Sequence, residues 1–489
     1  MIAPDEIIVD LFAGGGGASL GIWQALGRHP DVAVNHSPDA VAVHTRNHPG
    51  THHYCESVWR VRPEDACAGR AVGLLWASPD CRHFSRAAGG GLKSDKVRSL
   101  PGVVLTWAKR ARPRVIIVEN VREMMGWGPL LDDGTPCPRR VGHSWNRWVG
   151  RLRGLGYRVQ WRELCAADHG APTIRTRLFV QARLDNEPIE WPKPTHSRDP
   201  SLFAPLAWRS AAECIDWSIP CPSIFTRRRP LQEATLRRIA HGVQKHVIGA
   251  AEPFVVRTGH WSHRTGEGFG FRGQGLADPL GTVTTVNDKA LVSASLAPIT
   301  HQGGQRGSAI TAPMPTITCA PRGEQALITA FLAQHNSDRG RYHPGRAATD
   351  PLATITTTGS QIGVVSAALS DYDRTAAERV SAFLIHYYSN GKQTQTLSEP
   401  LGATTTRARF ALVMVAGVPR PIVDIGMRML TPAELAAAQG FPTDYDLTDD
   451  GRLTKTRTIH LIGNSVCPPV AAAVVRAAFS RRATVRAAA

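Results

Sequence analysis

The feature that most constrains the fold is a β-branched apolar run that leads directly into a cluster of glycines. Residues 7–12 (IIVDLF) have the composition of a short buried strand, and residues 13–21 (AGGGGASLG) follow before an apparent helix. Glycines there let the backbone approach a ligand, and the helix offers its N-terminal amides and positive dipole end. This order predicts a doubly wound α/β sheet that binds a nucleotide-like ligand, although a purely structural tight turn has the same pattern.

Further apolar runs have the length of buried strands: residues 32–34, 72–77 and 115–118. Asn35 follows the first run, at a position where doubly wound domains commonly have an acidic residue for ribose hydroxyls. Cys81 follows the second run, after Pro79 has ended the strand, and Glu119 follows the third. Open α/β sheets bind ligands at the carboxyl ends of their strands, so we expect Cys81 and Glu119 on one rim.

A fourth segment carries two arginines. Residues 157–161 alternate like a strand and lead to Arg175 and Arg177, which face the same way if their segment is extended. Each residue taken alone has an ordinary explanation, because cysteines are often inert packing, carboxylates often cap helices and arginines often lie on basic surfaces. The chemical interpretation therefore depends on their combination.

The middle of the chain contains a fourfold repeat of proline- and threonine-rich phrases at residues 278–285, 312–318, 350–357 and 399–406. Their spacing of about 35 to 50 residues is typical of repeated supersecondary units. A β-like run precedes each phrase, at residues 254–256, 296–299, 331–333 and 383–385. Basic, histidine-containing loops between the runs and the phrases are suited to contacts with nucleic-acid phosphates and base edges. The alternative is that the repeat serves only packing or oligomerisation.

Length and charge bound the remaining choices. A chain of 489 residues is too long for one ordinary core. We expect a catalytic and cofactor-binding domain at 1–183, a linker with a basic helix at 184–250, a repeat domain at 251–416 and a return to the catalytic domain at 417–489. The formal charge of +17 favours a polyanionic partner, and nine cysteines without a zinc pattern favour reduced thiols. No apolar run is expected to reach the ~20 residues that span a bilayer.

Taken together, the motifs resemble those of the DNA cytosine-5 methyltransferase family, in the family's order. The resemblance is carried by residues 10–17, by Cys81 with Phe84 and Ser85, and by residues 119–121, Arg175 with Arg177, 439–442 (QGFP) and 463–466 (GNSV). It implies a doubly wound S-adenosylmethionine-dependent methyltransferase fold, with the β-rich repeats inserted as a target-recognition domain. The implied reaction is methylation of carbon 5 of a flipped-out cytosine in duplex DNA.

The resemblance also assigns roles. Cys81 would be the nucleophile that adds to carbon 6, Glu119 would hold the base at N3 and its amino group, and Arg177 with Arg175 would bind the O2 edge and anchor the catalytic loop. S-adenosyl-L-methionine is the implied cofactor, and no metal is implied. The positions expected to contact the cofactor are Asp10, Phe12, Ala13, Gly14, Gly16, Gly17, Asn35, Ser57, Pro79, Leu100, Asn464 and Ser465.

Four positions depart from the family pattern: Asp80 and Arg82 beside the nucleophile, Thr173 where the arginine motif usually begins with glutamine, and Asn35 in place of a ribose-binding glutamate. An anion beside a thiolate raises its pKa and a cation lowers it. Alternatives are a tRNA cytosine-5 methyltransferase, an inactive DNA-binding protein that still binds the cofactor, and use of another cofactor. The long repeat domain favours duplex DNA over tRNA. We expect a cytoplasmic, DNA-associated monomer of bacterial or phage type without a membrane contact, compatible with a restriction endonuclease partner.

Overall fold

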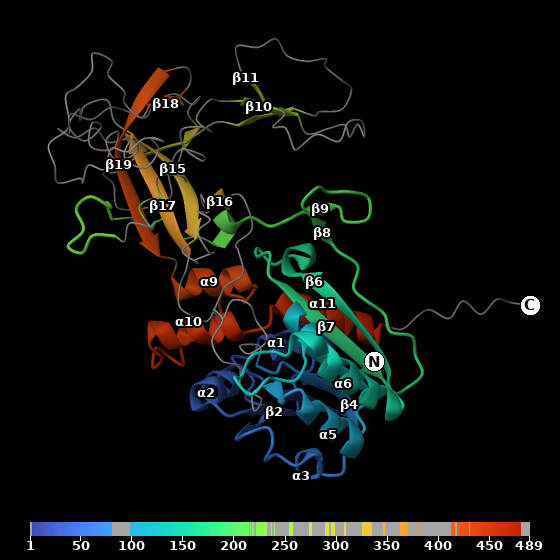
Figure 1. Ribbon diagram of the computed structural model, residues 1–489. Coiled ribbons are helices and arrows are strands. Elements are labelled where there is room, and N and C mark those ends of the chain that lie inside the picture. The colour runs from blue at the N-terminus through green and yellow to red at the C-terminus, as the bar shows by residue number, and fades with distance from the viewer. Residues whose placement is uncertain are drawn as a thin grey trace, which may run out of the picture. The chain divides into compact units, whose positions relative to one another are not determined.

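The computed structural model describes residues 2–80, 98–214 and 431–480, short stretches between 216 and 239, and separate strands between 254 and 429. The chain divides into two compact units (Figure 1). The first comprises Met1–Ile215, Thr349–Ser360 and Thr431–Ala489, and the second Asp216–Ala348 and Gln361–Leu430. The domain boundaries at 183, 250 and 416 stay predictions.

The first unit contains a seven-stranded sheet in the order β3-β2-β1-β4-β5-β7-β6. Its strands are β1 (Ile7–Leu11), β2 (Val32–Asn35), β3 (His52–Cys55), β4 (Val72–Ala77), β5 (Val115–Asn120), β6 (Arg158–Cys165) and β7 (Thr176–Arg183). All neighbouring pairs are parallel except those of β7, which runs antiparallel to β5 and β6. The strand order reverses between β1 and β4, and this is where open α/β sheets bind ligands. The predicted doubly wound α/β fold is confirmed.

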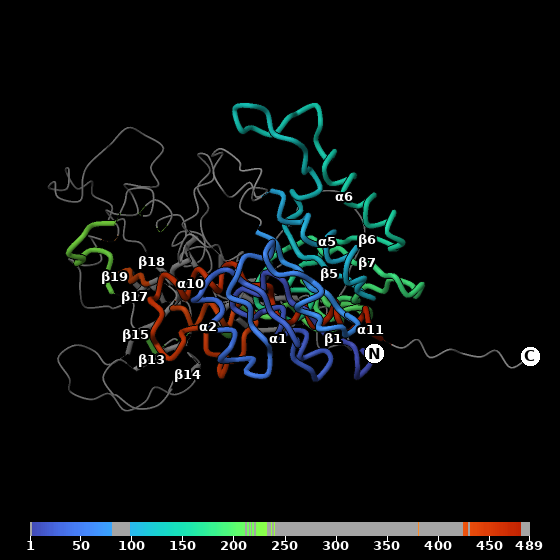
Figure 2. Tube along the Cα trace, turned by 90° about the horizontal axis from the view of Figure 1, so that it is seen from below, coloured from blue at the N-terminus to red at the C-terminus, as the bar shows by residue number. Residues whose placement is uncertain are grey.

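Helices cover both faces of this sheet. The helices of the first unit are α1 (Gly17–Leu26), α2 (Pro38–Asn47), α3 (Pro63–Cys67), α5 (Gly102–Arg110), α6 (His143–Gly154), α9 (Pro432–Gln439), α10 (Lys455–Asn464) and α11 (Pro468–Phe479). Figure 2 shows α5 and α6 on one side of the strands and α1 and α11 on the other. The α1 and α11 layer therefore joins the two ends of the chain.

Alternation along the strands explains the two layers. In β1, Ile7 and Val9 pack into a core with residues of α5 and α6, whereas Ile8 points to the other face and packs with α1 and α11. In β4, Leu75 and Trp76 divide in the same way. Because both faces are covered, the strands read as continuous apolar runs, which is why they were recognisable in the sequence.

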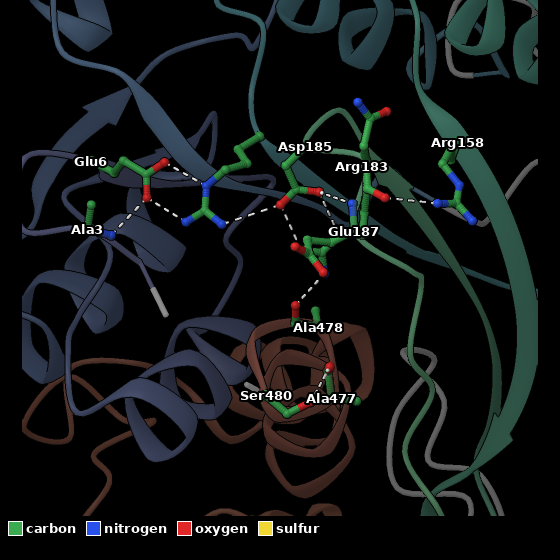
Figure 3. A network of polar contacts seen from close by, with 11 residues as sticks. Ala3, Glu6, Arg158, Arg183, Asp185, Glu187, Ala477, Ala478 and Ser480 are labelled. Atoms are coloured by element: carbon green, nitrogen blue, oxygen red, sulfur yellow. Dashed lines mark hydrogen bonds and ion pairs between the residues drawn. The ribbon is translucent and has the colours of Figure 1, made fainter. Parts of the chain in front are cut away.

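Ion pairs close the amino-terminal edge of the sheet (Figure 3). Arg114, just before β5, contacts Glu6 before β1 at 2.5 Å and Asp185 after β7 at 3.5 Å. Arg183 at the end of β7 pairs with Asp185 at 2.7 Å and donates to the carbonyl of Ala478 in α11. We call Glu6, Arg114, Arg183 and Asp185 the amino-edge clamp. It fixes the edge opposite the carboxyl ends of β1, β4 and β5.

A capping box marks the start of the helix α9. Thr431 is the N-cap of α9, and its hydroxyl and the Glu434 side chain form a reciprocal capping box. Among the described residues, the segment Lys455–Phe479 is long and apolar enough to span a bilayer by length and composition, with a mean hydropathy of 1.4 over an 18-residue window. That window is 78% buried, and the segment contains α10 and α11, so its apolar character is accounted for by the core of the first unit.

The second unit is built from antiparallel strands. Its sheets have the orders β11-β10-β12 and β14-β13-β15-β17-β19-β18, with β16 paired to β15. The strands are β10 (Phe254–Arg257), β11 (Gly273–Gly275), β12 (Lys289–Val292), β13 (Ser295–Pro298), β14 (Ser308–Ala309), β15 (Gln325–Gln334), β16 (Arg346–Ala347), β17 (Ile362–Leu369), β18 (Leu412–Val415) and β19 (Val418–Met429). β10 and β15 contain two of the expected β-like runs, and β13 covers all but the last residue of a third. The four threonine-rich phrases, the run at 383–385 and most of the chain between 231 and 250, where the basic helix was expected, lie outside the described residues.

Candidate active site

The turn between β1 and α1 has an unusual backbone. Phe12 has φ 63°, Gly14 has φ 55° and Gly16, the N-cap of α1, has φ 88°. A bulky residue such as Phe12 rarely adopts positive φ, and such strain is concentrated at functional sites. Phe12 and Gly14 are half-buried, so they form the accessible part of the turn. The amides at the start of α1 follow immediately, as a bound anionic or polar group requires.

Two glycines of the turn are held by the C-terminal part of the chain. A Cβ on Gly16 would lie 2.0 Å from the Tyr445 hydroxyl, and one on Gly17 would lie 2.2 Å from both Ser465 Oγ and the Val466 carbonyl. The Tyr445 hydroxyl also donates to the Gly15 carbonyl at 2.9 Å. Close packing therefore requires glycine at 16 and 17, in addition to any approach of a ligand.

Asp10 lies beneath this turn and is fully buried. Its Oδ2 accepts a hydrogen bond from Ser19 Oγ at 2.7 Å, whereas among the described residues its Oδ1 has no hydrogen-bond partner. Burial raises the pKa of the Asp10 carboxyl to about 7, and the Ser19 hydrogen bond opposes that rise. A half-satisfied buried carboxylate is costly, and a cationic group bound nearby would stabilise its ionised form.

The other expected cofactor positions divide by exposure. Asn35, Ser57 and Leu100 are half-buried and Asn464 is exposed, whereas Ala13, Pro79 and Ser465 are buried. The Asn35 side-chain oxygen accepts from the Ser37 amide at 2.9 Å, so its Nδ2 group is the part that could donate to a ribose hydroxyl. Ser465 accepts at its carbonyl from Gln439 Nε2 at 2.9 Å, which joins the QGFP and GNSV motifs.

Cys81 and Arg82 lie outside the described residues, but the segment that leads to Cys81 is well anchored. Asn120 Nδ2 donates to the Pro79 carbonyl at 2.8 Å, and both residues are buried. The Ser78 amide donates to the Leu11 carbonyl at 3.2 Å. These bonds tie the end of β4 to the ends of β1 and β5, so the chain enters residue 81 from the same edge as Glu119.

Glu119 and the two arginines meet at this edge. Glu119 lies within β5, its Oε1 is 3.4 Å from Arg177 Nε, and its side chain is only 9% exposed. Arg175 is 5% exposed and lines the same small cavity as Glu119 and Arg177. The expectation that both arginines face one way agrees with this common lining. A carboxylate fixed by a guanidinium can present its second oxygen to a planar amine and ring nitrogen.

The cavity has one further reactive side chain that the sequence analysis did not select. Cys467, at the N-cap of α11, lines it with Glu119 and the arginines. Burial raises the pKa of the Cys467 thiol to about 12, although the two arginines partly oppose this. A neutral thiol is a poor nucleophile, so Cys467 is a wall of the cavity. Nothing in its local sequence indicates that α11 starts beside β7. Thr173, one of the departures from the family pattern, is fully buried just before the arginines.

Comparisons with known proteins identify the family. The sequence profile of the family described as C-5 cytosine-specific DNA methylase matches residues 7–208 and 325–480. The type II methyltransferase M.AgeI of Thalassovita gelatinovora is 30% identical over 196 residues, covering 38% of this chain and 42% of that protein. The type II methyltransferase M.NaeI of Lentzea aerocolonigenes is 29% identical over 215 residues, covering 42% and 48%. The chain thus spans less than half the length of these relatives.

Among solved structures, the Dnmt2 methyltransferase of S. pombe is 14% identical, with a TM-score of 0.48 over 96% of this chain and 98% of that chain. The family profile covers well over half of the 489 residues and includes all seven strands of the first unit's sheet together with α9, α10 and α11. The chain therefore belongs to the C-5 cytosine-specific DNA methylase family.

Proposed function

We propose that this protein transfers a methyl group from S-adenosyl-L-methionine to carbon 5 of cytosine in duplex DNA, through a covalent adduct with Cys81 and a flipped-out base. The observation that carries the proposal is the convergence of three segments at one sheet edge. Glu119 pairs with Arg177 there, and the neighbouring Asn120 holds Pro79, two residues before Cys81. Family membership supports the same reaction.

The turn between β1 and α1 fits the cofactor. S-adenosylmethionine carries a sulfonium and an ammonium group, and the buried Asp10 carboxylate, with its Oδ1 lacking a hydrogen bond among the described residues, would offset that charge. Phe12 would cover the adenine, Asn35 would bind the ribose, and the amides of α1 would meet the carboxylate. When bound, the cofactor supplies an electrophilic methyl group.

The chain's own residues carry the rest of the reaction. The Cys81 thiolate attacks carbon 6 of cytosine, and as the sulfur–carbon bond forms, the electron pair moves toward carbon 5. Glu119 hydrogen-bonds N3 and the amino group, and protonation at N3 offsets the charge that the thiolate brings. Arg177 holds Glu119 and, with Arg175, reaches the O2 edge. After methylation a base removes the carbon 5 proton, and the returning electron pair expels the Cys81 thiolate.

The net charge of +17 supports a DNA substrate, because phosphate contacts by lysine and arginine supply most of the non-specific affinity for DNA. Base flipping costs a few kcal/mol, which those contacts would offset. We also propose a cytoplasmic, DNA-associated monomer, for which a type II restriction endonuclease is a compatible partner. The matched relatives bear type II names. A tRNA substrate is the second candidate, and it is supported only by the motifs that tRNA and DNA cytosine-5 methyltransferases share.

The test uses tritiated S-adenosylmethionine with cytosine-rich duplex DNA, and a second duplex that carries 5-fluorocytosine. Fluorine cannot leave as a proton does, so the Cys81 adduct should accumulate and survive denaturant. Cys81→Ala should lose both label and adduct by more than about 10³-fold. Cys55→Ala, which changes an exposed cysteine, should keep both. Label on tRNA alone would replace the DNA substrate, and salt-sensitive DNA binding with no label or adduct would contradict the enzyme.

A further inference from the structure

Four histidines of the first unit gather behind the glycine turn. His44 is in the last turn of α2, His48 is the C-cap residue of that helix, and each is 1% exposed. His29 precedes β2, and His53 is in β3. His29 Nδ1 is 2.8 Å from His48 Nδ1, and His44 Nδ1 is 2.7 Å from His53 Nε2. We call these four residues the histidine network. The rings of His44 and His48 are 4.5 Å apart between centroids.

Two hydrogen-bonded routes connect the network to the turn. In the first, His44 Nε2 is 2.9 Å from Ser19 Oγ, which donates to Asp10 Oδ2 at 2.7 Å. In the second, His48 Nε2 is 3.0 Å from the Tyr445 hydroxyl, which donates to the Gly15 carbonyl at 2.9 Å. One route ends at the carboxylate under the turn and the other at its backbone.

The donors along these routes fix the protons. Tyr445 gives its one hydroxyl proton to the Gly15 carbonyl and Ser19 gives its own to Asp10, so His48 Nε2 and His44 Nε2 act as donors. Neutral His48 and His44 then accept at Nδ1, from His29 and His53 respectively. Each of these side-chain contacts has one proton while the four rings are neutral. An added proton would place a cation among closely packed imidazoles, with like charges on adjoining rings repelling each other.

Burial outweighs the groups that would favour such a charge. Backbone contacts with Gly16 and Thr51 raise the pKa values of His48 and His53, but burial lowers each of them by more. Burial is the main reason that the pKa values of His29, His44, His48 and His53 all lie below the ordinary histidine value. His52 beside His53 adds repulsion, and Tyr445 is neutral because burial raises its pKa well above the usual range. The acids that face α2 are already paired, since Arg46 contacts Asp446 at 2.6 Å and also Asp450. Asp10 is the carboxylate that the network reaches, through Ser19.

We propose that the histidine network holds the glycine turn in its binding shape only while the network is neutral, so that acidification lowers cofactor affinity. An open turn admits water to the imidazoles and lets them take up protons, whereas the closed turn excludes those protons. Proton uptake and cofactor binding therefore compete by linkage. The inference rests on the proposed function, since the cofactor is S-adenosylmethionine, and it makes His44 and His48 positioning residues.

A metal ion is not the better explanation for the cluster. In the part of the chain that the structure describes, no group of three or more histidine, cysteine, aspartate or glutamate side chains could hold a metal ion. The imidazole nitrogens instead face one another in pairs and are occupied by those contacts. The network is therefore a set of hydrogen bonds between α2, β3 and the turn.

The test measures binding of S-adenosylhomocysteine, which lacks the transferable methyl group, by calorimetry between pH 5.5 and pH 8. The dissociation constant should be flat above about pH 7 and rise below it by up to about tenfold per pH unit for each proton released. His48→Gln keeps a donor for Tyr445 but cannot be protonated, so its pH dependence should be clearly shallower. His143→Gln, which changes an exposed histidine on α6, should match the wild type.

A second measurement needs no variant. Calorimetry at pH 6 in buffers of different ionisation enthalpy counts the protons released on binding, and a positive count is expected.

The variant Asp10→Asn distinguishes protons released by the histidines from protons released by the Asp10 carboxyl. The His48 route reaches the turn without Asp10, so proton release should persist in this variant. A count near zero, or equal pH dependence in wild type, His44→Gln and His48→Gln, would overturn the network's role and leave the proposed function standing. Absence of binding at every pH, for both S-adenosylmethionine and its demethylated product, would overturn both.

Discussion

The two edges of the catalytic sheet are built by opposite rules. At the amino edge the clamp satisfies its charges: Arg114 bridges Glu6 and Asp185, and Arg183 adds a second contact to Asp185. At the carboxyl edge Asp10 Oδ1 lacks a hydrogen bond among the described residues, and Phe12 has a positive φ. Saturated polar groups contribute stability, whereas incompletely satisfied ones are positioned for a ligand. The residues that stabilise the sheet and the residues placed for a ligand therefore lie at opposite ends of the same strands.

Of the changes that compare the two edges, the largest effect is expected at Glu119. Glu119→Gln keeps the size of the side chain but weakens both the Arg177 ion pair and protonation at N3, so turnover should fall about 10²- to 10³-fold. The midpoint of thermal unfolding should change little, because we expect Glu119 to act in the reaction and to contribute little to the stability of the fold. Single-turnover methylation with saturating DNA measures the change.

Glu163→Gln provides the matched control, since Glu163 on β6 pairs with Arg122 at 3.2 Å and does not line the cavity. Its turnover should stay near the wild-type value. An equal loss of turnover in Glu119→Gln and Glu163→Gln would contradict a specific role for Glu119.

The amino-edge clamp should show the reverse pattern. Arg114→Ala leaves Glu6 and Asp185 without their shared cation, and since the three side chains are only partly buried we expect a loss of about 1–3 kcal/mol in unfolding free energy. Activity per folded molecule should be unchanged. Denaturant titration and a methylation assay at low temperature measure the two quantities.

Arg110→Ala is the control for this edge. Arg110 pairs with Glu64, but both side chains are more than 40% exposed, so its loss should be below about 1 kcal/mol. A loss of catalytic rate in Arg114→Ala, at temperatures where it is folded, would contradict the separation of the edges.

The smallest effect is expected at Asn120. Asn120→Ala removes the hydrogen bond to Pro79 and frees the start of the segment that contains Cys81, so turnover should fall about tenfold. Adduct formation with 5-fluorocytosine DNA should slow by the same factor, while cofactor binding stays constant. Asn146→Ala, on the exposed surface of α6, should change neither rate. A weakened cofactor affinity instead would place Asn120 in the turn's support.

The local pattern of apolar residues predicted individual strands, whereas the topology of the sheet determines which elements are in contact. The runs at 72–77 and 115–118 correspond to β4 and to most of β5, because the burial of a strand is visible in the apolar character of neighbouring residues. Glu119 was expected just after a strand, yet β5 continues through Asn120, since β7 pairs with it there. The proximity of Cys467 to Arg175 depends on where α11 packs, which no local signal encodes.

The histidine network illustrates the same limit. The spacing of His44 and His48 places them on one helix face, but His29 and His53 join them only because β2 and β3 lie side by side. Tyr445 and Ser465 arrive from the far end of the chain. Such contacts are set by the order of strands and by the return of the C-terminal segment.

That return has a consequence for synthesis. Ile8, Leu74 and Trp76 lie on one sheet face once the first unit's strands have left the ribosome, but α11 (Pro468–Phe479), which covers that face together with α1, is made last. At translation rates of about 5–20 residues per second, that face waits for roughly 15 s to 1 min. Until then the part of this face that α11 covers stays open to solvent. A ribosome that stops within the repeat region releases a chain that cannot complete its first unit.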